Sequence, residues 1–383
     1  MRTISILGAT GSVGASTLDL VRREPGKWQV VALTANCQAA ELAALAREFS
    51  AELAVVADER CLPDLRAALA GSGIAAAGGA AALVEAAARP VDLTMAAIVG
   101  CAGLAPTMAA IEQGRAVALA NKEALVSAGD VMINACAHYG TTLLPVDSEH
   151  NAIFQCLAGN DLADVRAITL TASGGPFRDW SHEQLSTATP AQAVKHPNWD
   201  MGAKISVDSA TMFNKGLELI EAHHLFPVGL DKLRIIIHPQ SVVHSMVEYR
   251  DGSTLAQLGP SDMRVPIASA LAWPGRMDTP CAALDLAKLG ELTFRKPDEA
   301  RFPATTLCRA AAEAGGAAPA VLNAANEIAV AAFLSGQIAF TRIAVMVAEV
   351  MSRYSPAAPA TLDDVIAVDH AARVLARELL ELA

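Results

Sequence analysis

Short apolar runs alternate with longer helical stretches over the first 147 residues, and this alternation constrains the fold more than any other feature of the sequence. The helical stretches are rich in alanine, as at residues 39–48 and 62–69. The apolar runs have the length of strands and occupy residues 4–7, 30–34, 53–57, 93–98, 116–120 and 142–146. Strands that alternate with helices predict an α/β domain, a doubly wound parallel sheet of the Rossmann type with helices on both faces. Ligands of such sheets bind at the carboxyl ends of the strands, so we expect site residues there.

The pattern changes after residue 147. Four strand-like runs are separated by polar loops rich in glycine and proline, which predicts a central α+β domain over residues 148–272. These runs occupy residues 167–172, 233–237, 242–249 and 254–258. Four prolines between residues 273 and 303 indicate a linker. Residues 304–383 predict a C-terminal helical bundle, with helices at 304–314, 320–334, 339–353 and from about 362.

Composition argues against two broad classes of partner. The 383 residues carry 29 Lys and Arg against 40 Asp and Glu, and the resulting net charge of −11 disfavours nucleic acid and anionic membranes. The longest uncharged run, residues 93–111, contains Gly100, Gly103 and Pro106, so it predicts a strand, a loop and a helix rather than a membrane span. Seven cysteines without a Cys-x-x-Cys pair indicate free thiols in a reducing cytoplasm. The first predicted strand begins at residue 4, which leaves no room for a signal peptide and also predicts a cytoplasmic protein.

A glycine-rich loop follows the first predicted strand. It reads Gly8-Ala9-Thr10-Gly11-Ser12-Val13-Gly14 and leads into a helical stretch. Glycines at this place permit a tight turn and a close approach of the backbone, and the helix N-terminus offers N–H groups to a pyrophosphate. A plain structural turn is the alternative, but the position between the first strand and the first helix favours a dinucleotide.

The end of the second predicted strand bears on the choice of dinucleotide. An acid there would bind the free ribose of NAD, but the chain has Asn36, Cys37 and Gln38, and no acid before Glu41. A 2′-phosphate would therefore not be repelled, which favours NADP. The alternative is ordinary variation of a loop.

Carboxylates follow the strand at residues 142–146. In an extended segment residues two apart point to the same side, so Asp147 and Glu149 are expected to converge on one cation. A third carboxylate, Glu218, lies on a predicted helix over residues 206–224, on one flank with Asn214 and Lys215. Such a flank can hold a metal and a phosphate side by side. Taken alone, the helix fits a solvated face with a surface ion pair between Lys215 and Glu218 better than it fits such a site.

A second glycine loop, Ser173-Gly174-Gly175-Pro176, offers a hydroxyl and backbone amides of the kind that bind phosphate. It opens a long irregular stretch that ends at residues 195–202 and contains Trp199 and Met201, which predicts an active-site lid. Two roles stay open for His196, phosphate ligand or turn residue. Ser209, expected in the first turn of the next helix, is either a phosphate donor or a local cap.

Taken together, these segments closely resemble the 1-deoxy-D-xylulose 5-phosphate reductoisomerase family. The resemblance covers essentially the whole chain, including residues 323–327 in the helical region. The motifs that carry it are residues 8–14, 120–123, 145–150, 173–177, 196–199 and 204–218.

The resemblance implies a two-stage reaction of non-mevalonate isoprenoid synthesis. The ketose phosphate is rearranged to an aldehyde with the help of Mg²⁺ or Mn²⁺, and NADPH then reduces the aldehyde to 2-C-methyl-D-erythritol 4-phosphate. The resemblance also implies a homodimer. Its subunit has a dinucleotide-binding domain (residues 1–147), a catalytic domain with a lid (148–272), a linker (273–303) and a helical bundle (304–383).

Individual residues also receive roles from the resemblance. The implied metal ligands are Asp147, Glu149 and Glu218, which with Lys122 form the catalytic set. The implied substrate contacts are Lys122, Ser148, Glu149, Ser173, His196, Ser209, Asn214, Lys215 and Glu218. The implied cofactor contacts, with Asn36 after the second strand, are Thr10, Gly11, Ser12, Val13, Asn121, Glu123 and Gly202.

One departure and two rival functions remain. Relatives often have Lys and Asn where this chain has Cys37 and Gln38, which leaves the details of 2′-phosphate recognition open. An NADP-dependent semialdehyde or acyl-phosphate dehydrogenase also carries such a glycine loop but needs a nucleophilic cysteine, for which Cys156 and Cys281 are the candidates. A catalytically inactive NADP-sensing protein would tolerate loss of the three acids.

Overall fold

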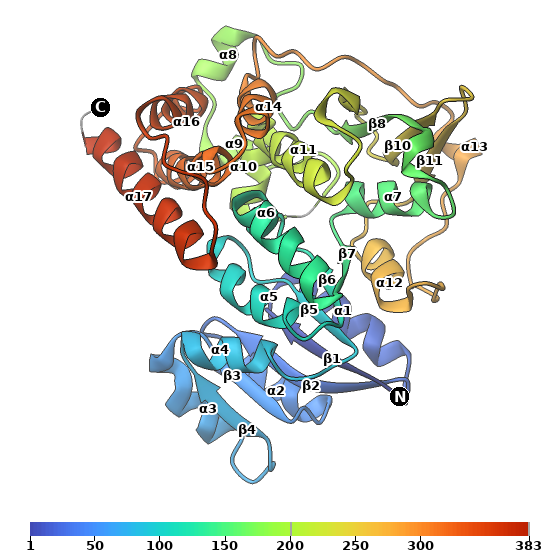
Figure 1. Ribbon diagram of the computed structural model, residues 1–383, viewed down its shortest axis with the longest axis vertical. Helices are drawn as coiled ribbons and strands as arrows, with labels where there is room; N and C mark the ends of the chain where they lie inside the picture. Colours follow the sequence, from blue (N-terminus) through green and yellow to red (C-terminus); the bar gives the residue numbers. More distant parts are fainter. Residues whose placement is uncertain (200, 382–383) are drawn as a thin grey trace. The chain divides into compact units, whose positions relative to one another are not determined.

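The computed structural model describes residues 1–199 and 201–381 (Figure 1). Its contacts divide the chain into two compact units. The first unit comprises Met1–Ala124, Met132–Asn151 and Met263–Cys281, and the second comprises Leu125–Val131, Ala152–Asp262 and Ala282–Ala383. The central segment and the C-terminal helices therefore cluster together, while residues 263–281 return to the N-terminal unit.

The first unit is built on a seven-stranded sheet in the order β4-β3-β2-β1-β5-β6-β7, in which every pair of neighbours is parallel. The strands are β1 (Arg2–Leu7), β2 (Trp28–Ala35), β3 (Leu53–Val56), β4 (Ala75–Gly78), β5 (Leu93–Ala96), β6 (Ala116–Leu119) and β7 (Thr142–Pro145). The chain order reverses direction between β1 and β5. This is the switch point at which doubly wound sheets bind their ligands, and it confirms the predicted fold class.

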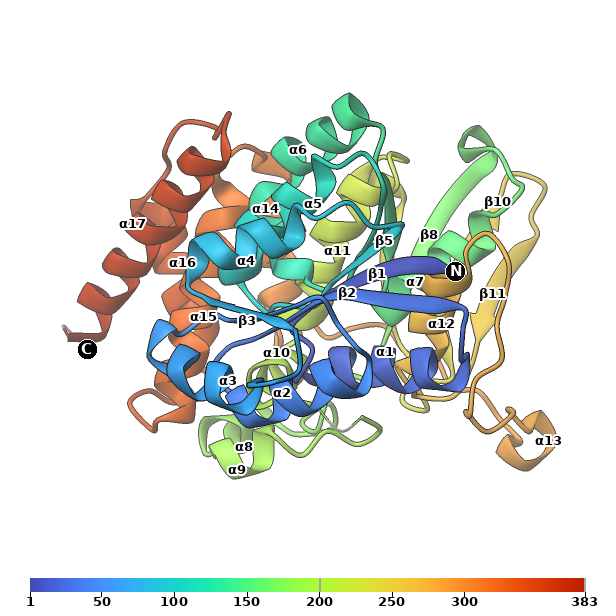
Figure 2. The ribbon, with the colours of Figure 1, turned by 90° about the horizontal axis from the view of Figure 1, so that it is seen from below.

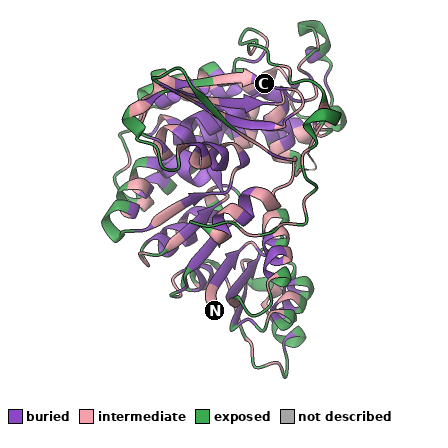
Figure 3. Cartoon of the chain, turned by 90° about the vertical axis from the view of Figure 1, so that its right-hand side faces the viewer, coloured by how far each residue is buried: buried purple, intermediate pink, exposed green. Residues whose placement is uncertain are grey.

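Helices cover both faces of this sheet. Figure 2 shows α1, α2 and α3 on one face and α4 and α5 on the other. The helices of this unit are α1 (Ser12–Arg23), α2 (Ala39–Glu48), α3 (Leu62–Ala68), α4 (Ala80–Ala87), α5 (Leu104–Ile111), most of α6 (Lys122–Tyr139) and α12 (Arg264–Ala272), with 3₁₀ turns at Glu59–Cys61 and Cys101–Gly103. Every residue of β3 and β5 is buried, and Figure 3 shows the strands of the chain coloured largely as buried.

Sequence patterns located six of these strands and missed β4. Its residues are alanine and glycine, and none of its four positions is buried, because it lies at the edge of the sheet. A strand without β-branched or aromatic residues gives no local signal, so only the neighbouring strand β3 defines it.

The second unit has a four-stranded sheet in the order β11-β10-β8-β9. Its strands are β8 (Val165–Ala172), β9 (Leu233–Ile237), β10 (Val243–Tyr249) and β11 (Thr254–Leu258). β8 is parallel to β9, while β10 is antiparallel to β8 and to β11. All four strands were predicted, and the mixed sheet confirms the α+β character of the central segment.

The helices that follow β8 differ from the sequence prediction. The predicted single helix over residues 206–224 is two helices, α10 (Ala203–Thr211) and α11 (Phe213–Leu225), broken at Met212. Met212 has φ 69° and ψ 6°, a left-handed conformation that ends α10 and redirects the chain. Short helices α8 (His182–Ser186) and α9 (Pro190–Ala193) precede them. The unit also contains most of α7 (Ser148–Leu157), α13 (Leu286–Leu289) and 3₁₀ turns at Leu162–Asp164 and Leu230–Lys232.

The C-terminal segment forms the predicted helices. They are α14 (Ala304–Ala314), α15 (Ala318–Leu334), α16 (Arg342–Arg353) and α17 (Leu362–Glu381). α15 is the central member, because it contacts α14, α16, α17 and α10. Its buried positions include Ala320, Ala324, Ala325, Ala329 and Ala332, so small residues let the neighbouring helices approach closely. α11 and α14 approach in the same way, since a Cβ at Gly216 would lie 2.5 Å from Cys308 Sγ.

Among the described residues, no helix combines the length and the apolar character that crossing a membrane requires.

Candidate active site

The loop after β1 has the geometry of a nucleotide-binding turn. Gly8 has φ 89°, and a Cβ there would lie 2.8 Å from the Ala97 carbonyl oxygen. A Cβ at Gly14 would lie 2.3 Å from the Gly8 oxygen. Gly11 is the N-cap residue of α1 and provides no side-chain cap, and Ser12, the first residue of the helix, is exposed beside it. The N-terminal turn of α1 therefore presents its backbone N–H groups at the switch point of the sheet.

The end of β2 places Asn36, Cys37 and Gln38 at the surface. The Gln38 side chain reaches back to the loop, where its Oε1 lies 3.5 Å from Thr10 Oγ1 and accepts a hydrogen bond of 3.2 Å from the Cys37 N–H. No carboxylate takes part in this arrangement, in keeping with the expectation of a dinucleotide that carries a 2′-phosphate.

Asn121 holds the turn between β6 and α6. Its Oδ1 accepts a hydrogen bond of 3.2 Å from the Ala124 N–H and caps α6, while its Nδ2 donates to the Gly100 oxygen at 2.9 Å. Asn121 is 2% exposed, and Glu123 in the first turn of α6 is 8% exposed. The side chain of Asn121 thus ties the loop after β5 to the loop after β6, both on the edge that contains the glycine loop.

Lys122 and Asp147 form a buried ion pair in the first unit. Their side chains are 7% and 14% exposed. β6 and β7 are adjacent and parallel, with Leu119 opposite Pro145, so residues that follow the two strands come together at one edge.

The segment after β7 departs from the sequence prediction in one respect. Asp147 and Glu149 do not share an extended stretch, because α7 begins at Ser148 and the Asp147 carbonyl accepts the Asn151 N–H at 2.8 Å as its first helical bond. The two carboxylates still approach, with oxygens within 4.8 Å of each other. Ser148 Oγ donates to Glu149 Oε2 at 2.5 Å. The convergence is therefore produced by the turn into the helix rather than by strand alternation.

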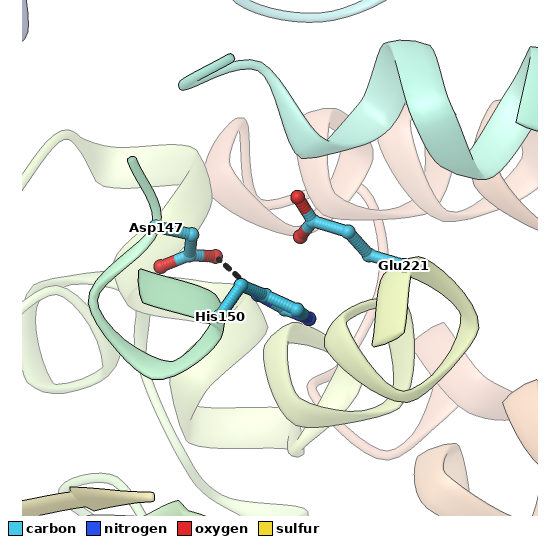
Figure 4. A group of neighbouring side chains, drawn as sticks. All are labelled: Asp147, His150 and Glu221. Atoms are coloured by element: carbon cyan, nitrogen blue, oxygen red, sulfur yellow. Dashed lines mark ion pairs between the residues drawn. The ribbon is translucent and has the colours of Figure 1, made fainter. Parts of the chain in front are cut away.

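His150 lies beside Asp147 and was not singled out from the sequence. Its ring is 0% exposed, and its Nδ1 is 3.9 Å from Asp147 Oδ2, as the dashed line in Figure 4 marks. One helical turn joins Asp147 to His150, so the i,i+3 spacing was available as a signal.

In the second unit, α11 assembles the predicted flank. Asn214 Nδ2 donates to Glu218 Oε1 at 2.5 Å, and Lys215 Nζ forms an ion pair with Glu218 Oε2. The side chains of Lys215 and Glu218 are 4% and 1% exposed, so the alternative of a solvated surface pair is wrong. Phe213 and Leu217 are buried on the same helix and anchor it. Glu221, also drawn in Figure 4, lies one turn after Leu217 and is 1% exposed.

Ser173 and His196 are joined directly. Ser173 Oγ is 2.9 Å from His196 Nε2. The Asn198 and Trp199 N–H groups both donate to His196 Nδ1, at 3.2 and 3.0 Å. Because Nδ1 accepts, the neutral ring carries its proton on Nε2, which donates to Ser173. His196 is thus both a turn residue and a neighbour of the second glycine loop, which begins at Ser173.

The second glycine loop, Ser173–Pro176, also packs on α10. A Cβ at Gly175 would lie 2.6 Å from the Ser209 oxygen and 2.9 Å from Ala210 Cα, so glycine permits this close approach. Ser209 lies in the last turn of α10 rather than in the first turn of a helix, because the helix ends at Met212. The predicted phosphate residues Ser173 and Ser209 are therefore neighbours through Gly175.

The predicted lid begins at an anchored turn. Asn198 Nδ2 donates to the Pro239 oxygen at 2.7 Å and to Ser241 Oγ at 2.9 Å. Trp199 lies 6.2 Å from the His244 ring between centroids. Met201 is half-buried and Gly202 is the N-cap residue of α10, while Asp200 lies outside the described residues.

Asp208 and Asn326 are a second pair that sequence reasoning missed. Asn326 Nδ2 donates to Asp208 Oδ1 at 2.8 Å, and Lys204 Nζ lies 2.8 Å from Asp208 Oδ2. Asp208 is 1% exposed and Asn326 is 0% exposed. This contact explains why the segment at residues 323–327 carries polar residues inside the bundle, since it binds α15 to α10.

Cys156 does not suit a catalytic nucleophile. It is buried on α7, and burial raises the pKa of its thiol to about 11. A thiol of this kind is protonated near neutral pH, whereas nucleophilic cysteines react as thiolates. The dehydrogenase alternative loses its candidate in the central segment.

Three family models together match most of the chain. Residues 4–129 match the model described as 1-deoxy-D-xylulose 5-phosphate reductoisomerase, residues 143–226 match its C-terminal domain, and residues 258–375 match the DXP reductoisomerase C-terminal domain. The chain belongs to the 1-deoxy-D-xylulose 5-phosphate reductoisomerase family. The reductoisomerase of Zymomonas mobilis is 59% identical over 380 residues, 99% of this chain and 98% of that protein. The family member of Afipia carboxidovorans is 55% identical, with 99% and 94% covered.

Solved structures of the reductoisomerase family match the fold as well. The enzyme of Zymomonas mobilis in complex with NADPH has a TM-score of 0.95 at 57% identity, with 99% of each chain covered. A reductoisomerase in complex with NADPH, fosmidomycin and magnesium has a TM-score of 0.94 at 44% identity, covering 100% of this chain and 99% of that chain.

Proposed function

We propose that this member of the family converts 1-deoxy-D-xylulose 5-phosphate to 2-C-methyl-D-erythritol 4-phosphate, with NADPH and a divalent metal ion. The observation that carries the proposal is the assembly of the predicted site residues into buried clusters. Lys122 pairs with Asp147 in one unit, and Asn214 and Lys215 bind Glu218 in the other. Relatives crystallised with NADPH and with magnesium support the choice of cofactors.

The chain's own residues fit NADPH. Gly8 and Gly14 leave space that a Cβ would fill, and the first turn of α1 offers backbone donors for the pyrophosphate. We assign the cofactor contacts to Thr10, Gly11, Ser12, Val13, Asn36, Asn121, Glu123 and Gly202. When bound, NADPH supplies the hydride of the reduction.

The residues also fit a hard divalent cation. Asp147, Glu149 and Glu218 are all carboxylates, the donors that Mg²⁺ and Mn²⁺ prefer, and we assign the metal to these three. Lys215 and Asn214 hold the buried carboxylate of Glu218 in place, and Ser148 holds that of Glu149. A metal bound there acts as a Lewis acid that stabilises negative charge on the substrate's oxygens.

Substrate recognition is assigned to the remaining polar residues of the two clusters. Lys215 supplies a positive charge and Asn214 an amide donor for the phosphate, with hydroxyls from the predicted loop and helix. The proposed phosphate contacts are Ser173, His196, Ser209, Asn214 and Lys215, and Lys122, Ser148, Glu149 and Glu218 contact the rest of the substrate. Trp199 and Met201 exclude water from the aldehyde when the lid closes.

We further propose four functional parts and a homodimer. Residues 1–147 bind the dinucleotide, 148–272 catalyse, 273–303 connect and 304–383 support the catalytic part. The exposed edge strand β11 carries Leu255 at 45% exposure, and the segment around α13 exposes Leu286, Leu292 and Phe294, an apolar surface suited to a second copy of the chain. A monomer in analytical ultracentrifugation would refute the dimer.

The free cysteines support action in the reducing cytoplasm.

The deciding experiment mixes the purified protein with 1-deoxy-D-xylulose 5-phosphate and NADPH and follows cofactor oxidation with and without a metal chelator. We expect oxidation that stops with the chelator and returns with added Mg²⁺ or Mn²⁺. Oxidation that persists with the chelator but is lost on thiol alkylation would support the dehydrogenase alternative instead.

A further inference from the structure

A cavity of about 240 Å³ lies in the second unit, next to the loop that begins at Ser173. Among the described residues, none that is assigned to substrate, metal or NADPH lines it. Its walls come from the segment that follows β8, from Met212 between α10 and α11, from Ile237 at the end of β9, and from the chain that leads into α14. The lining residues are Gly174, Arg178, Asp179, Met212, Ile237, Arg295, Lys296, Pro297, Asp298, Arg301, Phe302 and Thr305. Pockets for drug-sized molecules span roughly 300–1,000 Å³, so this volume suits a small metabolite.

Positive charge dominates the lining. Four cationic side chains, Arg178, Arg295, Lys296 and Arg301, face two carboxylates, those of Asp179 and Asp298. The chain as a whole has a net charge of −11, so a local excess of two positive charges is opposite in sign to the rest of the molecule. Such a concentration of cations in a concave site attracts anions.

Ion pairs hold these cations without neutralising them all. Asp179 lies 3.3 Å from Arg178 and 2.9 Å from Arg295, so one carboxylate serves two guanidinium groups. Asp298 lies 2.8 Å from Arg301. The side chains of Arg178 and Arg301 are each 29% exposed, and partial burial strengthens their attraction for an anion.

Thr305 provides an independent sign of a ligand. It lines the cavity and is 3% exposed, and its Oγ1 is buried with no hydrogen-bond partner among the described residues. An unpaired buried hydroxyl is unfavourable, and a ligand oxygen would satisfy it. Thr305 belongs to the first turn of α14, an 11-residue helix whose N-terminus has no side-chain cap, so its dipole also favours an anion.

We infer that this cavity binds a small phosphate compound that carries at least two negative charges, such as a diphosphate. The guanidinium groups of Arg178 and Arg301 match the geometry of phosphate oxygens, Arg295 and Lys296 lie at the exposed rim, and Thr305 donates from the wall. This site shares no lining residue with the proposed substrate-phosphate contacts, although Arg178 donates to the Ser173 carbonyl oxygen at 3.4 Å, and it goes beyond the proposed reaction.

The test is isothermal titration calorimetry of the full chain with inorganic pyrophosphate, in buffer free of divalent metal. Thr305→Val keeps the shape of the side chain and removes only the hydroxyl, and its control is Thr306→Val at the exposed neighbour. A double variant, Arg295→Gln with Lys296→Gln, removes rim charge. Its control is Arg234→Gln, whose side chain is 55% exposed against 57% for Arg295.

We expect one pyrophosphate per chain, with affinity weakened about five- to tenfold in Thr305→Val and at least about tenfold in the double variant. The two controls should bind as the unchanged chain does. Equal affinity in all variants, or no binding at millimolar pyrophosphate, would overturn the proposal. Loss of binding in Lys215→Met with full binding in the cavity variants would also overturn it, because the anion would then occupy the substrate-phosphate residues.

Discussion

Gly11 and Gly14 lie in the same loop after β1 but meet different constraints. A Cβ at Gly14 would clash with the Gly8 oxygen at 2.3 Å, whereas a Cβ at Gly11 meets the same oxygen at an ordinary 3.4 Å. Gly14→Ala should therefore lower the free energy of unfolding by about 1–3 kcal/mol. Gly11→Ala, at the N-cap of α1, should lower it by less than about 1 kcal/mol. Urea denaturation of the two variants checks this difference.

NADPH binding separates the two glycines in a second way. Gly11→Ala should keep the fold yet weaken NADPH by about tenfold, because the added methyl obstructs the approach of the pyrophosphate to the backbone. Fluorescence titration of NADPH gives the affinity. Unchanged NADPH affinity in a folded Gly11→Ala protein would contradict the assignment of this loop to the cofactor.

His224 makes stability depend on pH. Burial lowers the pKa of its imidazole below the ordinary value of 6.5, an effect that the Asp130 carboxylate opposes and His223 reinforces. The unfolded chain therefore takes up the proton first, so stability is fully present above about pH 6.5 and is lost as the pH falls toward the folded pKa. Thermal midpoints at pH 7.5 and 5.5 should differ less in His224→Gln than in the unchanged chain.

The exposed His138 supplies the control for that measurement. His138→Gln should keep the full pH dependence of the unchanged chain. An equal loss of thermal midpoint in the unchanged chain and in His224→Gln would show that other groups cause the acid sensitivity.

At the scale of residues, the sequence predicted contacts within one helix and missed contacts between elements. Asn214, Lys215 and Glu218 were placed on one flank because three and four residues make about one helical turn, and the structure joins them. The pairing of Lys122 with Asp147 required knowledge that β6 and β7 are neighbours. Asp208 and Asn326 are 118 residues apart, so no local pattern could relate them.

At the scale of elements, prediction followed the strength of the local signal. Strands rich in valine, leucine and isoleucine were found, while the alanine-glycine strand β4 was missed. The break between α10 and α11 was missed because Met212 is a good helix former, and its left-handed φ is imposed by its surroundings. Met212 is 3% exposed, so the packing of its side chain restrains its backbone conformation.

One cation forms an ion pair between α17 and α15. Arg373 on α17 binds Glu327 of α15 at 2.6 Å and Asp369 at 2.7 Å, with side chains 18%, 18% and 10% exposed. Removing the cation leaves two largely buried carboxylates without their ionic partner, although Asn323 Nδ2 still donates to Glu327 at 3.1 Å, so Arg373→Ala should cost about 3 kcal/mol of unfolding free energy. Urea denaturation measures the loss, and Arg377→Ala at the exposed neighbouring turn should cost well under about 0.5 kcal/mol.

At the scale of the whole molecule, bound ligands should report on the assignment of the metal. Mg²⁺ at about 100 times its dissociation constant should stabilise the unchanged chain by about 2.7 kcal/mol. Glu218→Gln keeps the shape of the side chain but removes the charge, so it should lose this stabilisation and turnover while keeping that from NADPH. Differential scanning calorimetry with each ligand checks both. A Glu218→Gln protein with unchanged turnover would refute the metal assignment.

The alanines of α15 have a consequence for how this protein tolerates change. A methyl group is nearly the smallest side chain that can be lost, so truncation at Ala320, Ala324 or Ala329 removes little, whereas any larger residue must push whole helices apart. A library of random substitutions should consequently show a one-sided pattern along this helix, with glycine and serine surviving more often than valine or leucine. Evolution of the bundle is then limited by steric crowding between its helices rather than by loss of buried apolar area.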